Sequence, residues 1–190
     1  MNKTLKEINS IIKSDKYFYL SSNIFKRIGY HIIKNDKYYI YKYFKYMRKT
    51  EHYKRNISFI NKILYYYNLR KKNIYGRLLD LDIGGTNIGK NITIYHRNIM
   101  INPNSIIGDN CKFHGNNCVG NNAFTKSSPK IGNNVNIGVG ASIIGDISVA
   151  NNSVIGANAL VNKNFPIEGS IIAGNPAKVI GNINNSDLTK

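Results

Sequence analysis

Two histidines in the second half of the 190-residue chain, His96 and His114, are the side chains best suited to moving a proton. An alcohol is almost un-ionised at neutral pH, and a neutral imidazole with an ordinary pKa of about 6.5 can accept its proton as the alcohol reacts. A zinc site needs three or four ligands, whereas the other two histidines, His31 and His52, lie far upstream. A histidine of this kind could act as a general base, and because two histidines alone do not make a zinc site, we predict no metal site.

The sequence around both histidines has a period of six, with one extra residue before Ile101 and an interruption at 124–130. The residues that recur at this interval are branched or aromatic: Ile88, Ile94, Ile101, Ile107, Phe113, Val119, Ile131, Ile137, Ile143, Val149, Ile155, Val161 and Ile167. Small or modest side chains follow four positions later, at Ser105, Cys111, Asn117, Ala123, Val135, Ala141, Ile147, Ser153 and Ala159. This period predicts a parallel β-helix whose apolar residues fill a prism.

The predicted β-helix also positions the histidines. If three rungs make one coil of about 18 residues, His96 and His114 would be neighbours on adjacent coils. The segment 124–130 should leave the prism as a loop. Cys111 and Cys118 lie seven positions apart, which fits neither a redox pair nor a zinc ribbon, and we expect reduced thiols that pack as small apolar side chains.

The segment 1–75 carries helix signals. Thr4 and Glu7 match a capping box, and Ser21 to Asn23 and Asp36 could open two further helices. One helical face contains Phe59, Ile60, Ile63, Leu64 and Tyr67, and the stretch 38–47 is apolar almost all round, so that helix should pack on both sides. We expect a basic, tyrosine-rich helical domain over 1–78, a β-helix over 79–181 and a polar tail over 182–190.

Charge divides the chain unequally. The net charge is +17, and residues 1–79 hold 19 Lys and Arg against four acids, whereas the rest holds 8 against 6. Such a segment could be a solvated helical surface, could lie on an anionic membrane or could bind nucleic acid; we expect no nucleic-acid partner. The sequence has neither a run of about 18 uncharged apolar residues nor a signal peptide pattern, so we expect a cytoplasmic protein that is peripheral to a membrane at most.

Three strings, INPNSIIGDNCKF, IGNNVNIGVGASIIGDISVANNSVIGANALV and AGNPAKVIG, resemble the serine acetyltransferase-related branch of the hexapeptide-repeat acyltransferases. Many enzymes of that branch acetylate capsular and other surface polysaccharides. The resemblance covers about 82–181 and, more loosely, the helical part. It implies a mainly β fold, namely a left-handed parallel β-helix preceded by a small helical domain. It also implies a homotrimer with acetyl-CoA between neighbouring coils.

The resemblance also implies roles for residues near IGKNITIYH and IMINPN. His96 matches the general base, and Asp82 matches the carboxylate that orients it, with Asp80 as a competitor. The intervals on both sides of His96 are each one residue shorter than the family's. His114 is either an acceptor contact or an inert turn residue. Positions matching the acetyl-CoA contacts are Gly120, Val139, Gly140, Ala157, Lys163 and Lys178.

The residues expected to bind the acceptor depart from the family's pattern. Serine-using members carry an acid before the catalytic histidine and an Arg-His pair before Pro-Lys, whereas this chain has Tyr95, Ser127 and Ser128 at those places. We therefore expect a sugar hydroxyl as acceptor, with Tyr95 as a stacking surface, and transfer in a ternary complex. The alternatives are a serine O-acetyltransferase of cysteine biosynthesis, a non-catalytic β-helix scaffold and, using the basic helices, a nucleic-acid binder.

Overall fold

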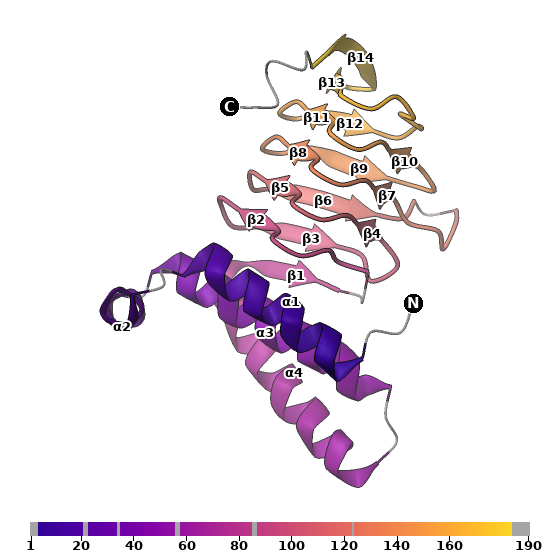
Figure 1. Cartoon of the computed structure of the whole chain (residues 1–190). Coiled ribbons are helices and arrows are strands. Elements are labelled where there is room, and N and C mark those ends of the chain that lie inside the picture. The colour runs from indigo at the N-terminus through magenta and orange to yellow at the C-terminus, as the bar shows by residue number, and fades with distance from the viewer. Residues whose placement is uncertain are drawn as a thin grey trace. The chain divides into compact units, whose positions relative to one another are not determined.

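A computed structural model describes residues 4–20, 23–33, 35–55, 58–84, 87–122 and 124–183. The chain divides into two compact units, Met1–Leu81 and Asp82–Lys190. The first unit is helical and the second consists of short strands (Figure 1). Ala123 and most of the polar C-terminal tail lie outside the described residues.

The helical unit consists of α1 (Leu5–Tyr19), α2 (Ile24–Ile32), α3 (Asp36–Lys54) and α4 (Phe59–Leu79). The predicted capping box at α1 is confirmed, because the Thr4 hydroxyl accepts from the Glu7 amide and the Glu7 carboxylate accepts from the Thr4 amide. Asn23 caps α2, and α3 begins at Asp36 after an Asn35 cap. Ser21 lies outside the described residues. Helices α1, α2 and α3 therefore begin where polar side chains replace the missing backbone acceptors, whereas Ser58 before α4 makes no such side-chain hydrogen bond.

Helix α3 is the centre of the helical unit. It packs against α1, α2 and α4, and it buries Tyr43, Phe44 and Met47 almost completely. Its apolar surface is thus covered from more than one side, as predicted. The face of α4 that begins at Phe59 is helical as predicted, but Phe59, Ile60, Ile63 and Tyr67 are 54–77% exposed. Among the described residues, no helix is long and apolar enough to cross a bilayer.

A buried ion pair joins α1 to α3. Arg48 Nε lies 2.8 Å from Asp15 Oδ2, and both side chains are almost fully shielded from solvent. The Arg48 guanidinium also lies over the Phe44 ring, 5.8 Å from its centroid. Because breaking a buried ion pair is costly, this pair helps to hold α1 against α3.

The second unit is a three-sided parallel β-helix. Its strands are β1 (Leu81–Ile83), β2 (Thr93–Ile94), β3 (Ile99–Ile101), β4 (Ile106–Ile107), β5 (Lys112–Phe113), β6 (Asn117–Gly120), β7 (Lys130–Ile131), β8 (Asn136–Ile137), β9 (Ser142–Ile144), β10 (Ser148–Val149), β11 (Val154–Ile155), β12 (Leu160–Val161), β13 (Ser170–Gly174) and β14 (Ala177–Asn182). They form a five-stranded sheet β1-β3-β6-β9-β12, a three-stranded sheet β10-β7-β4 and a six-stranded sheet β14-β13-β11-β8-β5-β2. We call these the first, second and third sheets. Neighbouring strands run parallel along the coils, whereas β13 and β14 are antiparallel.

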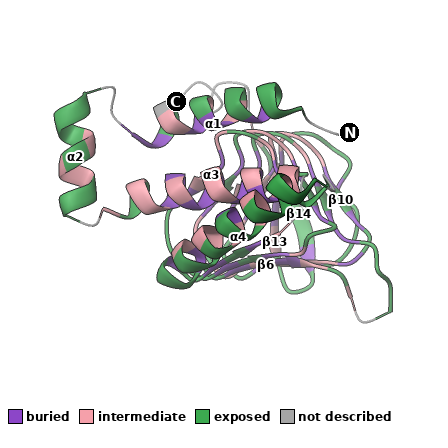
Figure 2. Ribbon diagram, turned by 90° about the horizontal axis from the view of Figure 1, so that it is seen from below, coloured by how far each residue is buried: buried purple, intermediate pink, exposed green. Residues whose placement is uncertain are grey.

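The interior of the prism contains the residues that the six-residue period predicts. Ile101, Ile107, Phe113 and Val119 are buried, as are their counterparts from Ile131 to Val161 (Figure 2). Ile167 is the exception, since it is 63% exposed. Phe165 occupies the inward position instead and bridges to Val149. The predicted inward role of Ile167 is therefore wrong.

Asparagines with positive φ form the turns of one corner. Asn91, Asn110, Asn134 and Asn152 have φ between 55 and 60°, a region that asparagine tolerates well. Their side-chain amides donate in series along the corner at 3.1, 3.0 and 2.9 Å. The recurrent asparagines thus supply both the turn conformation and a hydrogen-bonded column that ties the coils together.

The predicted loop at 124–130 is confirmed up to Lys130, which already belongs to β7. Ile107 pairs with Ile131, and Ile131 pairs in turn with Val149, so the coil that contains the loop is one rung longer than the coil that follows it. The Asn122 side chain shapes the loop, because its Oδ1 accepts from the amides of Phe124 and Thr125. Phe124 is 93% exposed, so the loop carries its aromatic side chain away from the prism.

Candidate active site

His96 lies in the turn between β2 and β3, at one corner of the prism, and is exposed. Seven positions separate Ile94 from Ile101, whereas six separate their partners in the next coil, Phe113 and Val119. The extra residue therefore belongs to the His96 turn. Asn98 completes this turn with φ of 63°, and its amide donates to Asn116 Oδ1 at 3.0 Å. The sequence thus builds a wider turn that holds His96 outside the prism.

Gly115 supports this turn from the next coil. It is buried and has φ of +109°, and a Cβ at this position would lie 2.7 Å from His96 Cβ and 3.2 Å from Arg97 O. Only glycine adopts such a backbone at little cost. The His96 turn can therefore rest directly on Gly115. Sequence reasoning missed this residue, although the longer interval between Ile94 and Ile101 indicated an unusual turn.

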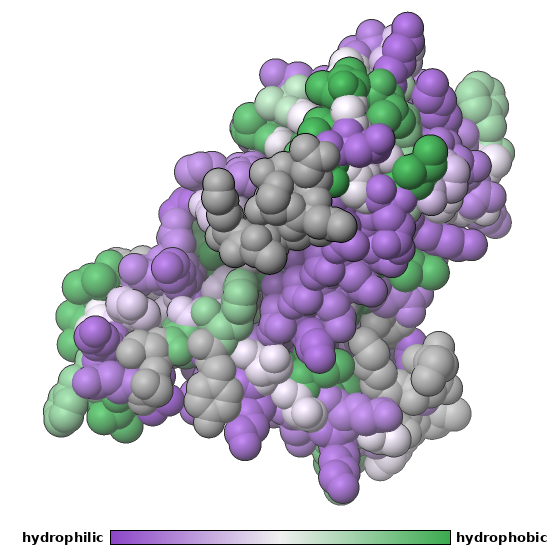
Figure 3. Space-filling model, turned by 45° about the horizontal axis from the view of Figure 1, so that its top comes forward, coloured by the Kyte–Doolittle hydropathy of each residue, from purple (hydrophilic) through white to green (hydrophobic). Residues whose placement is uncertain are grey.

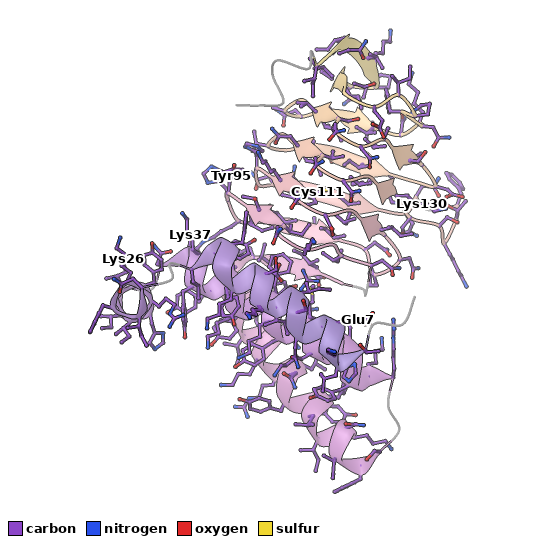
Figure 4. The ribbon with its side chains drawn as sticks, in the orientation of Figure 1. Glu7, Lys26, Lys37, Tyr95, Cys111 and Lys130 are labelled. Atoms are coloured by element: carbon purple, nitrogen blue, oxygen red, sulfur yellow. The ribbon has the colours of Figure 1, made fainter. Side chains whose placement is uncertain are left out.

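His114 stacks on Tyr95, not on His96. Ile94 pairs with Phe113, one position beyond the partner that three rungs would give. The next residues, Tyr95 and His114, therefore meet, with ring centroids 4.6 Å apart and planes at 28°. The three-rung count that predicted neighbouring imidazoles is wrong at this corner, because the extra residue follows His96. Figure 4 shows Tyr95 at the edge of the coil, where it is 51% exposed.

Asn136 holds the His114 ring in place. His114 Nε2 donates to Asn136 Oδ1 at 2.7 Å, since a carbonyl oxygen can only accept. The order Tyr95, His114, Asn136 forms a platform built from three successive coils, and we call it the Tyr95 platform. It lies next to His96 in sequence and offers an aromatic face fixed by a hydrogen bond. Asn136 was not foreseen from the sequence.

The two predicted carboxylates differ in their surroundings. Asp82 is the outward, exposed residue of β1, which neighbours β3 in the first sheet. Asp80 ends α4 with left-handed backbone, φ 51° and ψ 45°, and its amide donates to the Gly76 carbonyl. Within the described chain, no hydrogen bond or ion pair joins Asp82 to His96. Only Asp82 belongs to the unit that carries His96.

The residues predicted to contact acetyl-CoA divide between two corners. Val139, Gly140 and Ala157 follow His96 down the same corner, because Gly140 N donates to Gly115 O and Asn158 N donates to Val139 O, each at 2.9 Å. Lys178 lies on β14 opposite Ala173 of β13, and these two strands continue the third sheet beyond the coils that carry Val139, Gly140 and Ala157. Gly120 is the last residue of β6 and Lys163 follows β12, so both lie at the C-terminal ends of strands of the first sheet, at a different corner of the prism.

The corner below His96 is lined by small or modest side chains. Successive positions are occupied by Gly115, Val139 and Ala157, and Val139 is 41% exposed. A chain that ran along this corner would therefore lie against side chains no larger than valine at these three positions. Lys178 would stand toward the end of that path and Lys163 at a different corner, where its Nζ lies 5.8 Å from the Phe165 ring centroid.

The cysteines have different environments. Cys111 is buried in the prism, and this burial raises the pKa of its thiol to about 11. Cys118 is half-buried in β6, opposite Met100 and Ser142. Neither is in a disulfide. Among the described residues, no group of three or more His, Cys, Asp or Glu side chains could hold a metal ion.

Comparisons with known proteins agree with this architecture. Residues 128–163 match the family described as bacterial transferase hexapeptide (six repeats). The chain is 38% identical over 104 residues to serine acetyltransferase 1, chloroplastic, of Arabidopsis thaliana, across 53% of this chain and 33% of that protein. It thus spans about a third of the length of this curated relative.

Two solved structures show the fold. One is the serine acetyltransferase of Brucella abortus strain S19 in complex with coenzyme A, with a TM-score of 0.69 and 20% identity, over 95% of this chain and 70% of that one. The other is soybean serine acetyltransferase complexed with serine, with a TM-score of 0.65 and 21% identity, over 91% and 69% of the two chains. The predicted left-handed parallel β-helix with an N-terminal helical region is therefore confirmed.

Proposed function

We propose that this hexapeptide-repeat protein is an acetyl-CoA-dependent O-acetyltransferase with His96 as its general base. The observation that carries the proposal is the corner column itself: an exposed imidazole on a widened turn, above Gly115, Val139 and Ala157. This arrangement combines a proton acceptor with a row of small side chains against which an extended thioester could lie. The B. abortus relative binds coenzyme A on the same fold, which supports acetyl-CoA as the co-substrate.

His96 would accept the proton of the acceptor hydroxyl while the hydroxyl oxygen bonds to the acetyl carbonyl carbon. The carbon–sulfur bond then breaks, and the imidazolium returns the proton to the departing sulfur. Asp82, the outward carboxylate of the strand beside β3, is the proposed group that orients the imidazole and offsets its charge. No covalent bond to the protein forms, so both substrates must be bound together.

Serine is the acceptor that the comparisons favour over the sugar expected from the sequence. The curated relative and both solved structures are named serine acetyltransferases, and the soybean protein was solved with serine. We therefore propose serine as the first acceptor to test. The tested hydroxyl would approach His96 from the solvent side of the turn, where the side chain is exposed.

A sugar hydroxyl is the second candidate, and the Tyr95 platform is the observation that favours it. Tyr95, the residue before His96 in the sequence, presents a half-exposed ring that stacks on His114, which is hydrogen-bonded to Asn136. An aromatic face suits the apolar side of a sugar ring and offers no charge to a serine ammonium group. Ser127 and Ser128 have neutral hydroxyl side chains, so neither supplies a cation for a serine carboxylate.

A homotrimer is proposed as the active form. The residues proposed to contact acetyl-CoA lie at both ends of the strands of the first sheet. Val139 and Ala157 precede strands of this sheet, whereas Gly120 and Lys163 lie where its strands end. If the corner of one subunit that carries Val139 and Ala157 packed against the corner of its neighbour that carries Gly120 and Lys163, both groups would line a single groove. Analytical ultracentrifugation of the purified chain checks the expected mass of three copies.

The function is tested by measuring free thiol released from acetyl-CoA by the full chain, with L-serine or with a panel of hexoses and N-acetylhexosamines as acceptor. His96→Ala should lower turnover by about 10² to 10⁴ fold. His52→Ala, which removes a histidine from α3, is the matched control and should keep wild-type turnover. Faster thiol release with serine than with any sugar supports the first acceptor, and the reverse order supports the second.

Two results would contradict the proposal. If coenzyme A gave no heat of binding in calorimetry and no acceptor released thiol, the chain would be a non-catalytic scaffold. If His96→Ala and His52→Ala had equal turnover, the base would be a different group.

A further inference from the structure

Helix α2 has an apolar face that is covered by nothing in the described chain. None of its residues is buried. Ile24, Phe25, Ile28 and Ile32 are 51–79% exposed, and their spacing of one, four and eight positions places them on one side of the helix. Four large apolar side chains on one short exposed helix are a feature that calls for a partner.

The other side of α2 is the one that meets the rest of the helical unit. The His31 ring lies 4.9 Å from the Tyr38 ring of α3, and Arg27 and Tyr30 are half-buried. At about 100° per residue these three side chains are grouped opposite the apolar face or at its border. Helix α2 therefore turns its polar side toward α3 and its apolar side to solvent, the reverse of a helix that contributes to a core.

The charge around this face has one sign. From Asn23 to Ile33 the sequence contains Lys26, Arg27 and His31 and no acid. The whole segment 1–79 carries 19 Lys and Arg against four acids. Figure 4 shows Lys26 projecting from α2, and the face of the molecule drawn in Figure 3 carries hydrophobic and hydrophilic residues side by side.

We infer that α2 lies in the interface of an anionic phospholipid bilayer, with Ile24, Phe25, Ile28 and Ile32 toward the acyl chains and Lys26 on the opposite, headgroup side of the helix. An amphipathic helix with apolar residues on one face and cations on its polar face binds such interfaces through buried apolar area and through attraction to anionic lipid. This inference concerns the helical unit alone and does not depend on the reaction at His96.

A lipid surface fits α2 better than a second copy of this chain does. Two copies would bring two strongly basic segments together, and the like charges would oppose the contact. An anionic bilayer accepts the apolar side chains and neutralises the cations at the same time. Nucleic acid would use the cations but would leave the four apolar side chains without a partner.

The test is flotation of the full chain with lipid vesicles. One set contains only phosphatidylcholine, and the other contains phosphatidylcholine with phosphatidylglycerol. The double variant Phe25→Ser, Ile28→Ser removes two of the four apolar side chains. The matched control is Phe59→Ser, Ile60→Ser, which removes the same two residue types from the exposed face of α4. All four positions are exposed, so both variants should keep the wild-type unfolding temperature.

The wild-type chain and the α4 control should float with the anionic vesicles, and raising the salt concentration should weaken this binding. The α2 double variant should bind about a hundredfold more weakly, because each of the two lost side chains removes apolar burial that corresponds to roughly an order of magnitude in affinity. Three results would overturn the inference. They are no flotation of the wild type, equal losses in both double variants, and a change of oligomeric mass confined to the α2 variant, since that last result makes the face a contact between copies.

Discussion

The support of His96 by Gly115 can be tested by one added methyl group. In Gly115→Ala the new Cβ would lie 2.7 Å from His96 Cβ and 3.2 Å from Arg97 O. Carbon atoms in contact are normally about 3.5 to 4.0 Å apart. The His96 turn must therefore move by roughly 1 Å, because the opposing side, Gly115 itself, is buried and fixed by its donation to Asn117 Oδ1 at 2.9 Å.

The expected loss of turnover follows from this displacement. A misplacement of about 1 Å of a catalytic group can cost about 10²-fold in rate, so we expect Gly115→Ala to lower kcat by about 10²-fold without touching any substrate. The substitution also strains the backbone at φ +109°, which should lower the free energy of unfolding by about 1–3 kcal/mol.

Gly145→Ala separates these two effects. Gly145 is also buried and has φ of +105°, but its added Cβ would meet no atom closer than Asn122 Nδ2 at 3.6 Å. It should therefore lose similar stability and keep kcat within a few-fold of the wild type. The assay is thiol release from acetyl-CoA at saturating acceptor, normalised to the folded fraction from circular dichroism. Equal kcat values for the two alanine variants would refute the claim that the position of His96 limits the reaction.

Two further predictions concern the helical unit. Arg48→Met removes the cation that lies 2.8 Å from the buried Asp15 carboxylate, and it should lower the free energy of unfolding in urea by about 3–5 kcal/mol. The control Lys54→Met, at an exposed position of α3, should change this free energy by no more than about 0.5 kcal/mol. Equal losses in the two variants would contradict a stabilising role for the ion pair. Burial and the nearby Tyr67 and Tyr75 phenols raise the pKa of Tyr46 from 10.0 to about 12, so the stability linked to this group is complete below pH 10 and is lost as the pH rises through about 12. Thermal unfolding across this range should show a smaller decline for Tyr46→Phe than for the wild type, and identical declines would show that Tyr46 is not the group responsible.

The six-residue period predicted the interior of the prism because each rung repeats the same local geometry. Residues from Ile101 to Val161 are buried as counted, since each of their strands is held in register by parallel pairing with at least one strand of a neighbouring coil. The period failed at Ile167, beyond the last strand of the second sheet, where the chain is held from one side only. There Phe165 bridges to Val149 and Ile172 pairs with Ile155, and both intervals are shorter than three full rungs.

The helical unit was predictable at its starts and less so at its surfaces. Thr4 and Glu7 carry a complete capping signal within one turn of helix, and it forms as expected. The apolar face of α4 around Ile63 was equally visible as a pattern, yet it is exposed. An apolar face with helical periodicity indicates that the helix packs against a partner. It does not indicate whether that partner is part of the same chain or another molecule, because either partner would require the same apolar residues.

The register around His96 shows why spacing alone did not fix the candidate site. The sequence contains one extra residue between Ile94 and Ile101, and this insertion could precede or follow His96. If it preceded His96, the three-rung count would hold and the two imidazoles would stack. It follows His96, because Ile94 pairs with Phe113, one position beyond three rungs. A glycine therefore lies below the proposed base, and His114 meets Tyr95.

The residues proposed to contact acetyl-CoA lie at opposite ends of the strands of the first sheet, and this separation bears on the proposed homotrimer. Val139 and Ala157 precede strands of that sheet, while Gly120 ends one strand and Lys163 follows another. A single extended acetyl-CoA molecule that follows the corner carrying His96, Val139 and Ala157 cannot also follow the corner at the other end of the same strands. Either Gly120 and Lys163 serve only the fold, or they act on the thioester bound to a neighbouring copy. The glycine at 120 favours the second reading, because a Cβ there would meet no atom closer than 4.0 Å, so the single chain gives no packing reason for a residue without a side chain.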